Sequence, residues 1–265
     1  MKKILYIGNN LKNKKSNTSY IQVLGTLLQK EGCSVHYASS KNNKVFRLLG
    51  MVCTCLRKAT SMDYVFIDTY STSNFYYALI ISQICRGLKV PYIPILHGGN
   101  LPERLKKNPD LAACIFKNAY KNVSPSLFLV HAFKQSGYDT TYIPNTIEID
   151  NYTWQQRNFK NLNILWVRSF SKIYNPSLAI KILKSLQEQG VAATLCMVGP
   201  DSDGTLQEVK DLAKTLNLTV KFTGKLTKEA WWQLAKDYQA ATIIFIPNNM
   251  PVSVIEAMAL GLPVV

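Results

Sequence analysis

The sequence predicts an α/β protein built from two doubly wound parallel sheets. Short, nearly continuous apolar runs alternate with helical patterns along the 265 residues, and such runs are typical of parallel strands that helices cover on both faces. The alternation restarts after a polar stretch at residues 148–161. We therefore expect two Rossmann-like domains, residues 1–150 and 151–265. The second is expected to be incomplete at its C-terminal end, because Pro263-Val-Val265 stands where another strand should begin.

In the first domain, the spacing of apolar residues separates strands from helices. Strands are expected at residues 3–7, 34–38, 64–68, 91–96, 122–124 and 141–144. Helices are expected at residues 19–31, 45–56, 74–84 and 125–136. Gly8 and Asn9 follow the first strand, in a turn where the backbone can approach a diphosphate. There is no G-x-G-x-x-G pattern, which argues against a dinucleotide oxidoreductase.

The second domain repeats the same alternation. Strands are expected at residues 163–167, 193–198, 219–223 and 242–246, and helices at residues 176–189, 206–216, 228–236 and 252–260. The last helix opens close to Pro251 and stops at Gly261, which suits a proline at a helix start and a glycine at a helix end. Its N-terminus would direct free backbone N–H groups at a ligand above the sheet, where a phosphate is favoured.

The charge is unevenly distributed. Residues 1–150 hold 19 Lys and Arg against 8 Asp and Glu, whereas residues 151–265 hold 12 against 8. A basic first half suits an anionic membrane or a phosphorylated acceptor, and it equally suits a solvated surface. No zinc-finger, RNP or helix-turn-helix pattern accompanies the charge, so we expect no nucleic-acid partner. The predicted helix at residues 45–56 either lies on an anionic membrane or belongs to the core.

Nothing in the sequence indicates export or a metal site. The longest apolar stretches, residues 48–56 and 75–85, fall short of the roughly 18–20 residues that span a bilayer. The six cysteines contain no CxxC pair, so reduced thiols in a cytoplasmic protein are the simplest interpretation. The three histidines are scattered and no paired Asp motif accompanies them, so no metal is expected.

The C-terminal residues resemble the signature of the retaining GT-B glycosyltransferases of family 4, the glycosyl transferases group 1. The matching residues are Glu256, Ala257, Met258, Ala259, Gly261, Pro263, Val264 and Val265. Asn248 and Asn249 stand where the family has Glu and Gly. Further segments that are similar to the family are Val123-Ser-Pro125, Tyr142-Ile-Pro-Asn-Thr-Ile147, Trp166-Val-Arg-Ser-Phe-Ser-Lys172, Met197-Val-Gly-Pro200 and Phe222-Thr-Gly224.

The resemblance implies a role for each matching site residue. Arg168 and Lys172 would bind the diphosphate and stabilise it as it leaves, although the spacing to Lys172 is one residue shorter than in the usual family pattern. Glu256 would accept hydrogen bonds from the donor ribose, and His97 would lie beside the transferred sugar. Asn248 would contact that sugar without a charge, which would shift sugar preference or weaken activity. The remaining donor contacts would come from Gly199, Gly224, Lys225, Leu226, Asn249, Met250, Pro251 and Val252.

The resemblance implies transfer of a sugar from a nucleotide-diphosphate sugar to a glycan, with lipid-linked glycans as the expected acceptors, in surface polysaccharide synthesis. The first domain would hold the acceptor, and its basic residues include Arg47, Arg57, Lys58, Arg104, Lys106 and Lys107. The expected location is the cytoplasm, or the inner face of the membrane. Two alternatives stay open: a non-catalytic nucleotide-sugar-binding protein, and a sugar-nucleotide epimerase of the same architecture.

Overall fold

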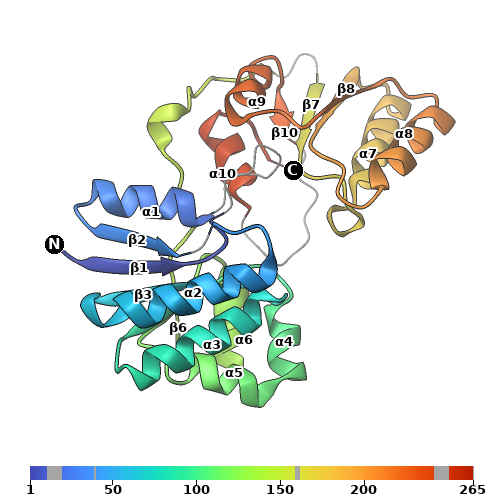
Figure 1. Ribbon diagram of the computed structural model, residues 1–265. Helices are drawn as coiled ribbons and strands as arrows, with labels where there is room; N and C mark the ends of the chain where they lie inside the picture. The colour runs from blue at the N-terminus through green and yellow to red at the C-terminus, as the bar shows by residue number, and fades with distance from the viewer. Residues whose placement is uncertain (11–19, 39, 159–161, 242–250, 265) are drawn as a thin grey trace. The chain divides into compact units, whose positions relative to one another are not determined.

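The structure is a computed structural model that describes residues 1–10, 20–38, 40–158, 162–241 and 251–264. The described residues form two compact units, one up to Thr146 and one from Ile147 onward. Each unit is built around one parallel sheet with helices on both of its faces (Figure 1). The doubly wound α/β fold predicted from the sequence is therefore confirmed.

The sheet of the first unit has the order β2-β1-β3-β4-β5-β6, and every neighbouring pair is parallel. The strands are β1 (Lys3–Ile7), β2 (Ser34–Ala38), β3 (Tyr64–Thr69), β4 (Tyr92–Leu96), β5 (Asn122–Ser124) and β6 (Thr140–Tyr142). The chain moves outward from β1 to β2 and then returns to β3 on the other side of β1. The carboxyl ends of β1 and β3 therefore form a topological switch point, where such sheets bind ligands.

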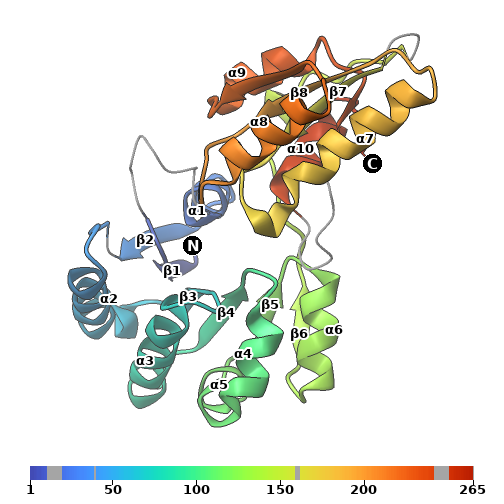
Figure 2. The same ribbon diagram turned by 90° about the vertical axis from the view of Figure 1, so that its right-hand side faces the viewer.

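The helices of this unit are α1 (Tyr20–Lys30), α2 (Lys44–Lys58), α3 (Asn74–Gly87), α4 (Leu101–Lys107), α5 (Pro109–Phe116) and α6 (Leu127–Gln135). Successive residues of a strand point to opposite faces. Leu5 and Ile7 accordingly join the large core cluster beneath α2, α3, α5 and α6, whereas Tyr6 packs with Ile21 of α1 on the other face. Figure 2 shows α1 and the pair α2 and α3 on opposite sides of the sheet.

The sheet of the second unit has the order β10-β7-β8-β9, again all parallel. Its strands are β7 (Leu162–Val167), β8 (Ala193–Val198), β9 (Val220–Gly224) and β10 (Ala240–Ala241), and its helices are α7 (Pro176–Glu188), α8 (Thr205–Thr215), α9 (Lys228–Ala235) and α10 (Val252–Ala259). Ile164 and Trp166 pack against α7 and α8, and Leu165 packs against α9 and α10. Apolar residues on both faces of β7 explain why its sequence does not alternate.

Among the described residues, two α-helices were not predicted from the sequence. No helix was predicted between residues 97 and 121, where the structure has α4 and α5. Both are short, and each has a proline in its first turn, which fits a helix start but also resembles a loop. The strand predicted at residues 242–246 lies outside the described residues, and β10 pairs with β7 directly before it.

The segment predicted as a polar linker is packed against the second unit. Arg157 donates from Nη1 to the carbonyls of Ala235, Lys236 and Tyr238 at 2.9–3.1 Å, and from Nη2 to the carbonyl of Leu260 at 2.5 Å. These oxygens lie at and beyond the C-terminal ends of α9 and α10, where carbonyls lack intrahelical partners. A cation there also complements the helix dipoles. The Arg157 side chain thus caps the C-terminal ends of both α9 and α10.

Replacing Arg157 by Ala is expected to lower the free energy of unfolding of the second unit by about 1–3 kcal/mol, because several acceptors lose their donor together. The four tryptophans, at positions 154, 166, 231 and 232, all lie in this unit, so tryptophan fluorescence during urea unfolding reports on it alone. Gln156→Ala, an exposed change in the same segment, is the matched control. Equal midpoints for the two variants would contradict the role of Arg157.

Candidate functional site

Three of the predicted residues of the second unit, Arg168, Gly199 and Gly224, lie at the carboxyl edge of its sheet. Arg168 follows β7 and Gly199 follows β8. The two loops pair through their backbones: the N–H of Arg168 donates to the carbonyl of Val198 at 3.0 Å, and that of Phe170 to the carbonyl of Pro200 at 2.8 Å. The parallel ladder thus continues beyond the strands and fixes the backbone of Arg168.

Gly199 permits this pairing because it lies against the backbone of Arg168. A Cβ atom at Gly199 would lie 1.6 Å from the carbonyl oxygen of Arg168, far inside van der Waals contact. The N–H of Gly199 donates to the carbonyl of Gly224 at 2.9 Å, and Gly224, which ends β9, has a φ of 71°. Both predicted glycines therefore have conformational roles that hold without a ligand.

Arg168 presents a guanidinium that is only partly satisfied. Its Cζ lies 4.4 Å from the centre of the Tyr174 ring, a cation–π contact. Its Nε is buried and has no hydrogen-bond partner among the described residues. Burial lowers the pKa of Arg168 from its ordinary value, but an arginine stays charged in proteins. A partly buried cation with an unused donor at a sheet's carboxyl edge suits an anionic ligand.

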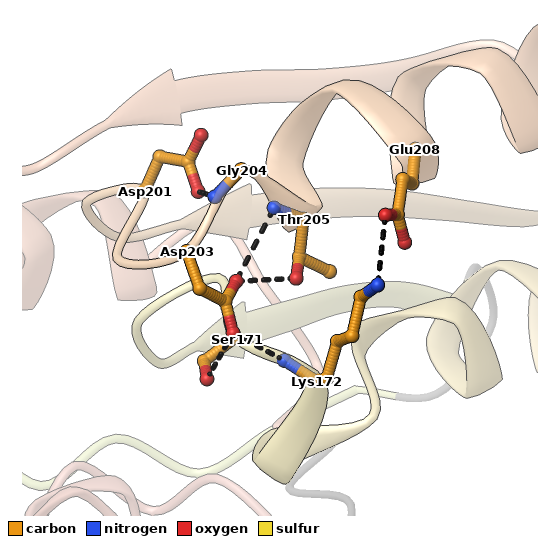
Figure 3. A network of polar contacts seen from close by, with 7 residues as sticks. All are labelled: Ser171, Lys172, Asp201, Asp203, Gly204, Thr205 and Glu208. Atoms are coloured by element: carbon orange, nitrogen blue, oxygen red, sulfur yellow. Dashed lines mark hydrogen bonds and ion pairs between the residues drawn. The ribbon is translucent and has the colours of Figure 1, made fainter.

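Lys172, by contrast, is exposed and already paired. Its Nζ lies 3.1 Å from Oε1 of Glu208 on α8, and the two side chains are 71% and 59% exposed. Figure 3 shows this ion pair beside the contacts of Asp203. The structure therefore gives the two predicted phosphate-binding cations different environments.

Glu256 lies inside the second unit with 4% of its surface exposed. Its Oε1 accepts a hydrogen bond from the Tyr152 hydroxyl at 2.7 Å. The same oxygen forms an ion pair with Nζ of Lys228 at 2.8 Å. Burial and the bond to this carboxylate raise the pKa of Tyr152, so the phenol remains a donor. The Tyr152 ring packs on Trp232, with centroids 4.5 Å apart. Neither Tyr152 nor Lys228 was predicted as a site residue.

Four further predicted residues of the second unit, Lys225, Leu226, Pro251 and Val252, lie near helix starts. Lys225 and Leu226 follow β9, and Leu226 is partly buried against the core beneath α9 and α10. Pro251 has an extended backbone, with φ −70° and ψ 142°, and Val252 begins α10. Three predicted residues, Asn248, Asn249 and Met250, lie outside the described residues.

In the first unit, the structure brings Gly8 and His97 together through Asp68, which lies near the end of β3. The Nε2 atom of His97 lies 3.0 Å from Oδ1 of Asp68, and the Tyr6 hydroxyl donates to the same oxygen at 3.0 Å. A Cβ atom at Gly8 would lie 2.4 Å from Oδ2 of Asp68. The cluster therefore occupies the switch point of the sheet.

Aromatic rings enclose the His97 imidazole. The Tyr70 ring stacks on it at 4.8 Å, and the Tyr20 ring meets it edge-on at 4.9 Å. Burial raises the pKa of Tyr20 to about 12 and that of Tyr70 above its ordinary value, so both phenols stay neutral. Asp68 was not predicted as a site residue, although a carboxylate at the end of an apolar strand is a signal that could have found it.

Asn9 is held by a buried arginine. Nη1 of Arg47 donates to Oδ1 of Asn9 at 2.8 Å, while its Nε and Nη2 donate to the carbonyls of Lys41 and Asn42 at 2.8 and 2.7 Å. Arg104 likewise donates to a backbone carbonyl in the loop after β3. Two of the basic residues expected to face an acceptor therefore make internal contacts instead.

Two other properties bear on ligands. Within the part of the chain that the structure describes, no three His, Cys, Asp or Glu side chains gather so as to hold a metal ion, and no helix has the length and apolar character to cross a membrane. A hollow lined by Asn163, Gln187 and residues 190–194 lies at the amino-terminal edge of β7 and β8, at the opposite end of these strands from Arg168 and Gly199.

Comparison with known proteins identifies the second unit. Residues 150–265 match the family described as Glycosyl transferases group 1. The second unit is therefore similar to the glycosyl transferases group 1 family. No curated protein sequence matches the chain significantly.

Solved structures share the fold of the whole chain, which is that of GT-B glycosyltransferases. HepE from Anabaena, solved with UDP and glucose, has a TM-score of 0.72 at 18% identity over 100% of this chain and 80% of its own. Sucrose-phosphate synthase from Thermosynechococcus elongatus has a TM-score of 0.72 at 14% identity, with coverage of 100% and 80%. The lipopolysaccharide outer core galactosyltransferase WaaB has a TM-score of 0.68 at 14% identity, with coverage of 99% and 79%.

The segment that matches the group 1 family includes Arg168, Lys172, Gly199, Gly224 and Glu256. The structure brings Arg168, Gly199 and Gly224 together at one sheet edge through backbone contacts. Their ligand roles, and those of Lys172 and Glu256, stay predictions.

In this domain, Gly199→Ala is expected to destabilise much more than Gly190→Ala. Both glycines have positive φ, of 156° and 78°, but a Cβ at Gly190 would meet no atom within 4 Å. Gly190→Ala should therefore cost only the conformational penalty of about 1–2 kcal/mol. Gly199→Ala should cost about 1–3 kcal/mol more, because the backbone must move.

Urea unfolding followed by tryptophan fluorescence measures both costs. Equal losses of stability in the two variants would show that the close approach of the β7 and β8 loops is not required.

Proposed function

We propose that this chain is a retaining glycosyltransferase. It would move a sugar from a nucleotide-diphosphate sugar to a glycan or lipid-linked glycan in surface polysaccharide synthesis, at the cytoplasmic face of the membrane. The observation that carries the proposal is Arg168, a fixed guanidinium in the group 1 domain with a buried and unpartnered Nε. The complex of HepE with UDP and glucose supports a nucleoside diphosphate as the leaving group.

The proposed chemistry depends on a positively charged side chain that is already in position before the reaction begins. When the bond between the sugar and the diphosphate breaks, negative charge develops on the departing oxygen. A fixed cation stabilises that charge without reorganising during the step. Arg168 meets this condition because its backbone belongs to the extended ladder and its side chain lies on Tyr174. In front-face transfer, the departing phosphate oxygen takes the acceptor's proton, so no protein nucleophile is required.

The first unit is proposed to hold the acceptor, with His97 beside the transferred sugar. Asp68 and the two tyrosine rings fix the plane of the imidazole. Such orientation of both reactants is a large part of the rate gain in bimolecular transfer. Glu256, oriented by Tyr152 and Lys228, is proposed to accept hydrogen bonds from the ribose.

Arg168→Ala is expected to lower the rate of transfer by about 100-fold, as the loss of one oxyanion donor does. Thermal unfolding with UDP, GDP and ADP first identifies the base, because a bound ligand raises the midpoint. Release of the nucleoside diphosphate from the matching sugar nucleotide, with a membrane lipid extract as acceptor source, then measures turnover. Lys184→Ala, which removes a partly exposed cation on α7, is the control, and a chelator is expected to leave turnover unchanged.

The same experiment separates the alternatives. A protein that binds the nucleoside diphosphate but releases none from the sugar nucleotide with any acceptor is a binding protein. One that converts the sugar nucleotide with no acceptor present is an epimerase. No shift with any nucleoside diphosphate, or an Arg168→Ala variant as active as the unchanged protein, would refute the proposed role of the site.

We further propose that α2 attaches the first unit to an anionic membrane surface. One face of the helix is buried through Met51 and Cys55, while the other leaves four apolar side chains 53–65% exposed: Val45, Phe46, Leu49 and Leu56. Lys44, Arg57 and Lys58 flank this stripe and are exposed, and no Asp or Glu lies between residues 44 and 58. An apolar stripe between cations is typical of helices that lie on anionic lipid.

The double substitution Phe46→Ser and Leu49→Ser is expected to weaken binding to phosphatidylglycerol vesicles by at least about tenfold, because two apolar side chains no longer leave water. Vesicle sedimentation measures the binding, and phosphatidylcholine vesicles test the need for charge. Leu127→Ser, at an equally exposed position in the same unit, is the control. If the unchanged protein, the double variant and Leu127→Ser all bind the phosphatidylglycerol vesicles equally, α2 is excluded as the attachment surface.

A further inference from the structure

The loop that contains Lys172 is joined to the start of α8 by a single carboxylate (Figure 3). Oδ2 of Asp203 accepts hydrogen bonds from the Ser171 hydroxyl at 2.7 Å and from the N–H of Lys172 at 3.0 Å. Oδ1 accepts from the N–H of Thr205 at 3.3 Å and from the Thr205 hydroxyl. The backbone of Lys172 is thereby tied to the first turn of α8.

Asp203 is charged throughout the physiological range. The hydrogen bonds from Thr205 and Ser171 hold the pKa of its carboxyl at about 2. These contacts anchor the backbone of Lys172 but not its side chain. The ammonium can therefore move between ligands by rotation about the side-chain bonds. In the structure that partner is Glu208, one turn along α8 from Thr205, at 3.1 Å.

An exposed ion pair of this kind contributes little. The Lys172 and Glu208 side chains are both more than half exposed, and pairs in that setting change an equilibrium by only about two- to fivefold. A diphosphate offers the same ammonium more charge and several acceptor oxygens. Exchange from Glu208 to a bound diphosphate therefore requires breaking a weak contact, and the loop backbone need not move.

We propose that Glu208 competes with the diphosphate of the donor for Lys172. Glu208 holds the ammonium while the site is empty, Lys172 transfers to the diphosphate when the donor binds, and Glu208 recaptures it as the nucleoside diphosphate leaves. Glu208 thus weakens diphosphate binding and favours product release. This inference rests on the proposed function of the second unit as the donor site.

Glu208→Gln is expected to tighten UDP binding by about two- to fivefold, since the competitor for Lys172 is lost. Isothermal calorimetry at low salt measures the affinity, with GDP or ADP as the probe if thermal unfolding selects that base. Glu188→Gln is the matched control, because it removes an equal charge from another exposed ion pair, Lys184–Glu188 on α7. A general effect of net charge would tighten binding in both variants, and the inference would then be wrong.

A double-mutant cycle tests whether the effect passes through Lys172. Lys172→Gln is expected to weaken UDP binding, and adding Glu208→Gln to that variant should produce no further change. If Glu208→Gln tightens binding equally with and without Lys172, the competition does not exist.

A measurement without nucleotide separates this inference from the proposed function. The acylation rate of the Lys172 amine, followed by peptide mass spectrometry, should rise about two- to fivefold in Glu208→Gln and stay unchanged in Glu188→Gln. An unchanged rate for Lys172 in Glu208→Gln would refute the pairing itself. A raised rate together with no binding of UDP, GDP or ADP would keep the pairing and refute the donor site.

Discussion

The second unit depends on the close approach between Gly199 and the backbone of Arg168. Any side chain at position 199 would overlap the carbonyl oxygen of Arg168, so only glycine allows the loops after β7 and β8 to extend the ladder of the sheet. That ladder holds the Arg168 backbone before any ligand arrives. Electrostatic stabilisation is most effective when the charged group need not reorganise. Because glycine has no side chain, position 199 allows the backbone of Arg168 to be fixed in this way.

The two predicted phosphate-binding cations differ because of their surroundings. Arg168 is restrained by its ring contact with Tyr174 and keeps an unused donor, while Lys172 extends into solvent toward Glu208. A guanidinium remains charged and offers a planar fork, whereas an ammonium is a compact charge on a flexible stem. A fixed cation suits a charge that develops during the reaction, and an adjustable one suits a ligand that must bind and leave. The residue types at positions 168 and 172 agree with this division.

Much of the fold follows from the sequence, because buried parallel strands appear as apolar runs and are bounded by glycine and proline. The helices α4 and α5 do not, since each is short and begins with a proline in its first turn. The site is predicted less completely. Gly8, His97 and Arg168 lie at strand ends and could be found there, but Tyr152 reaches Glu256 across 104 positions. Contacts of that kind arise from packing, and no periodicity encodes them.

The segment from Tyr152 to Arg157 affects both the stability of the second unit and the orientation of a candidate site residue, Glu256. Tyr152 donates to the carboxylate of Glu256, and Arg157 donates to carbonyls at the ends of α9 and α10. These two helices also contribute Lys228 and Glu256. A change that loosens the segment must therefore release the helix ends and disturb the orientation of Glu256 together. If Glu256 binds the donor as proposed, substitutions there are expected to alter ligand binding, even though the hydrogen bonds of Arg157 to the described residues go to backbone carbonyls, because the carboxylate is oriented by the same segment that stabilises its helix.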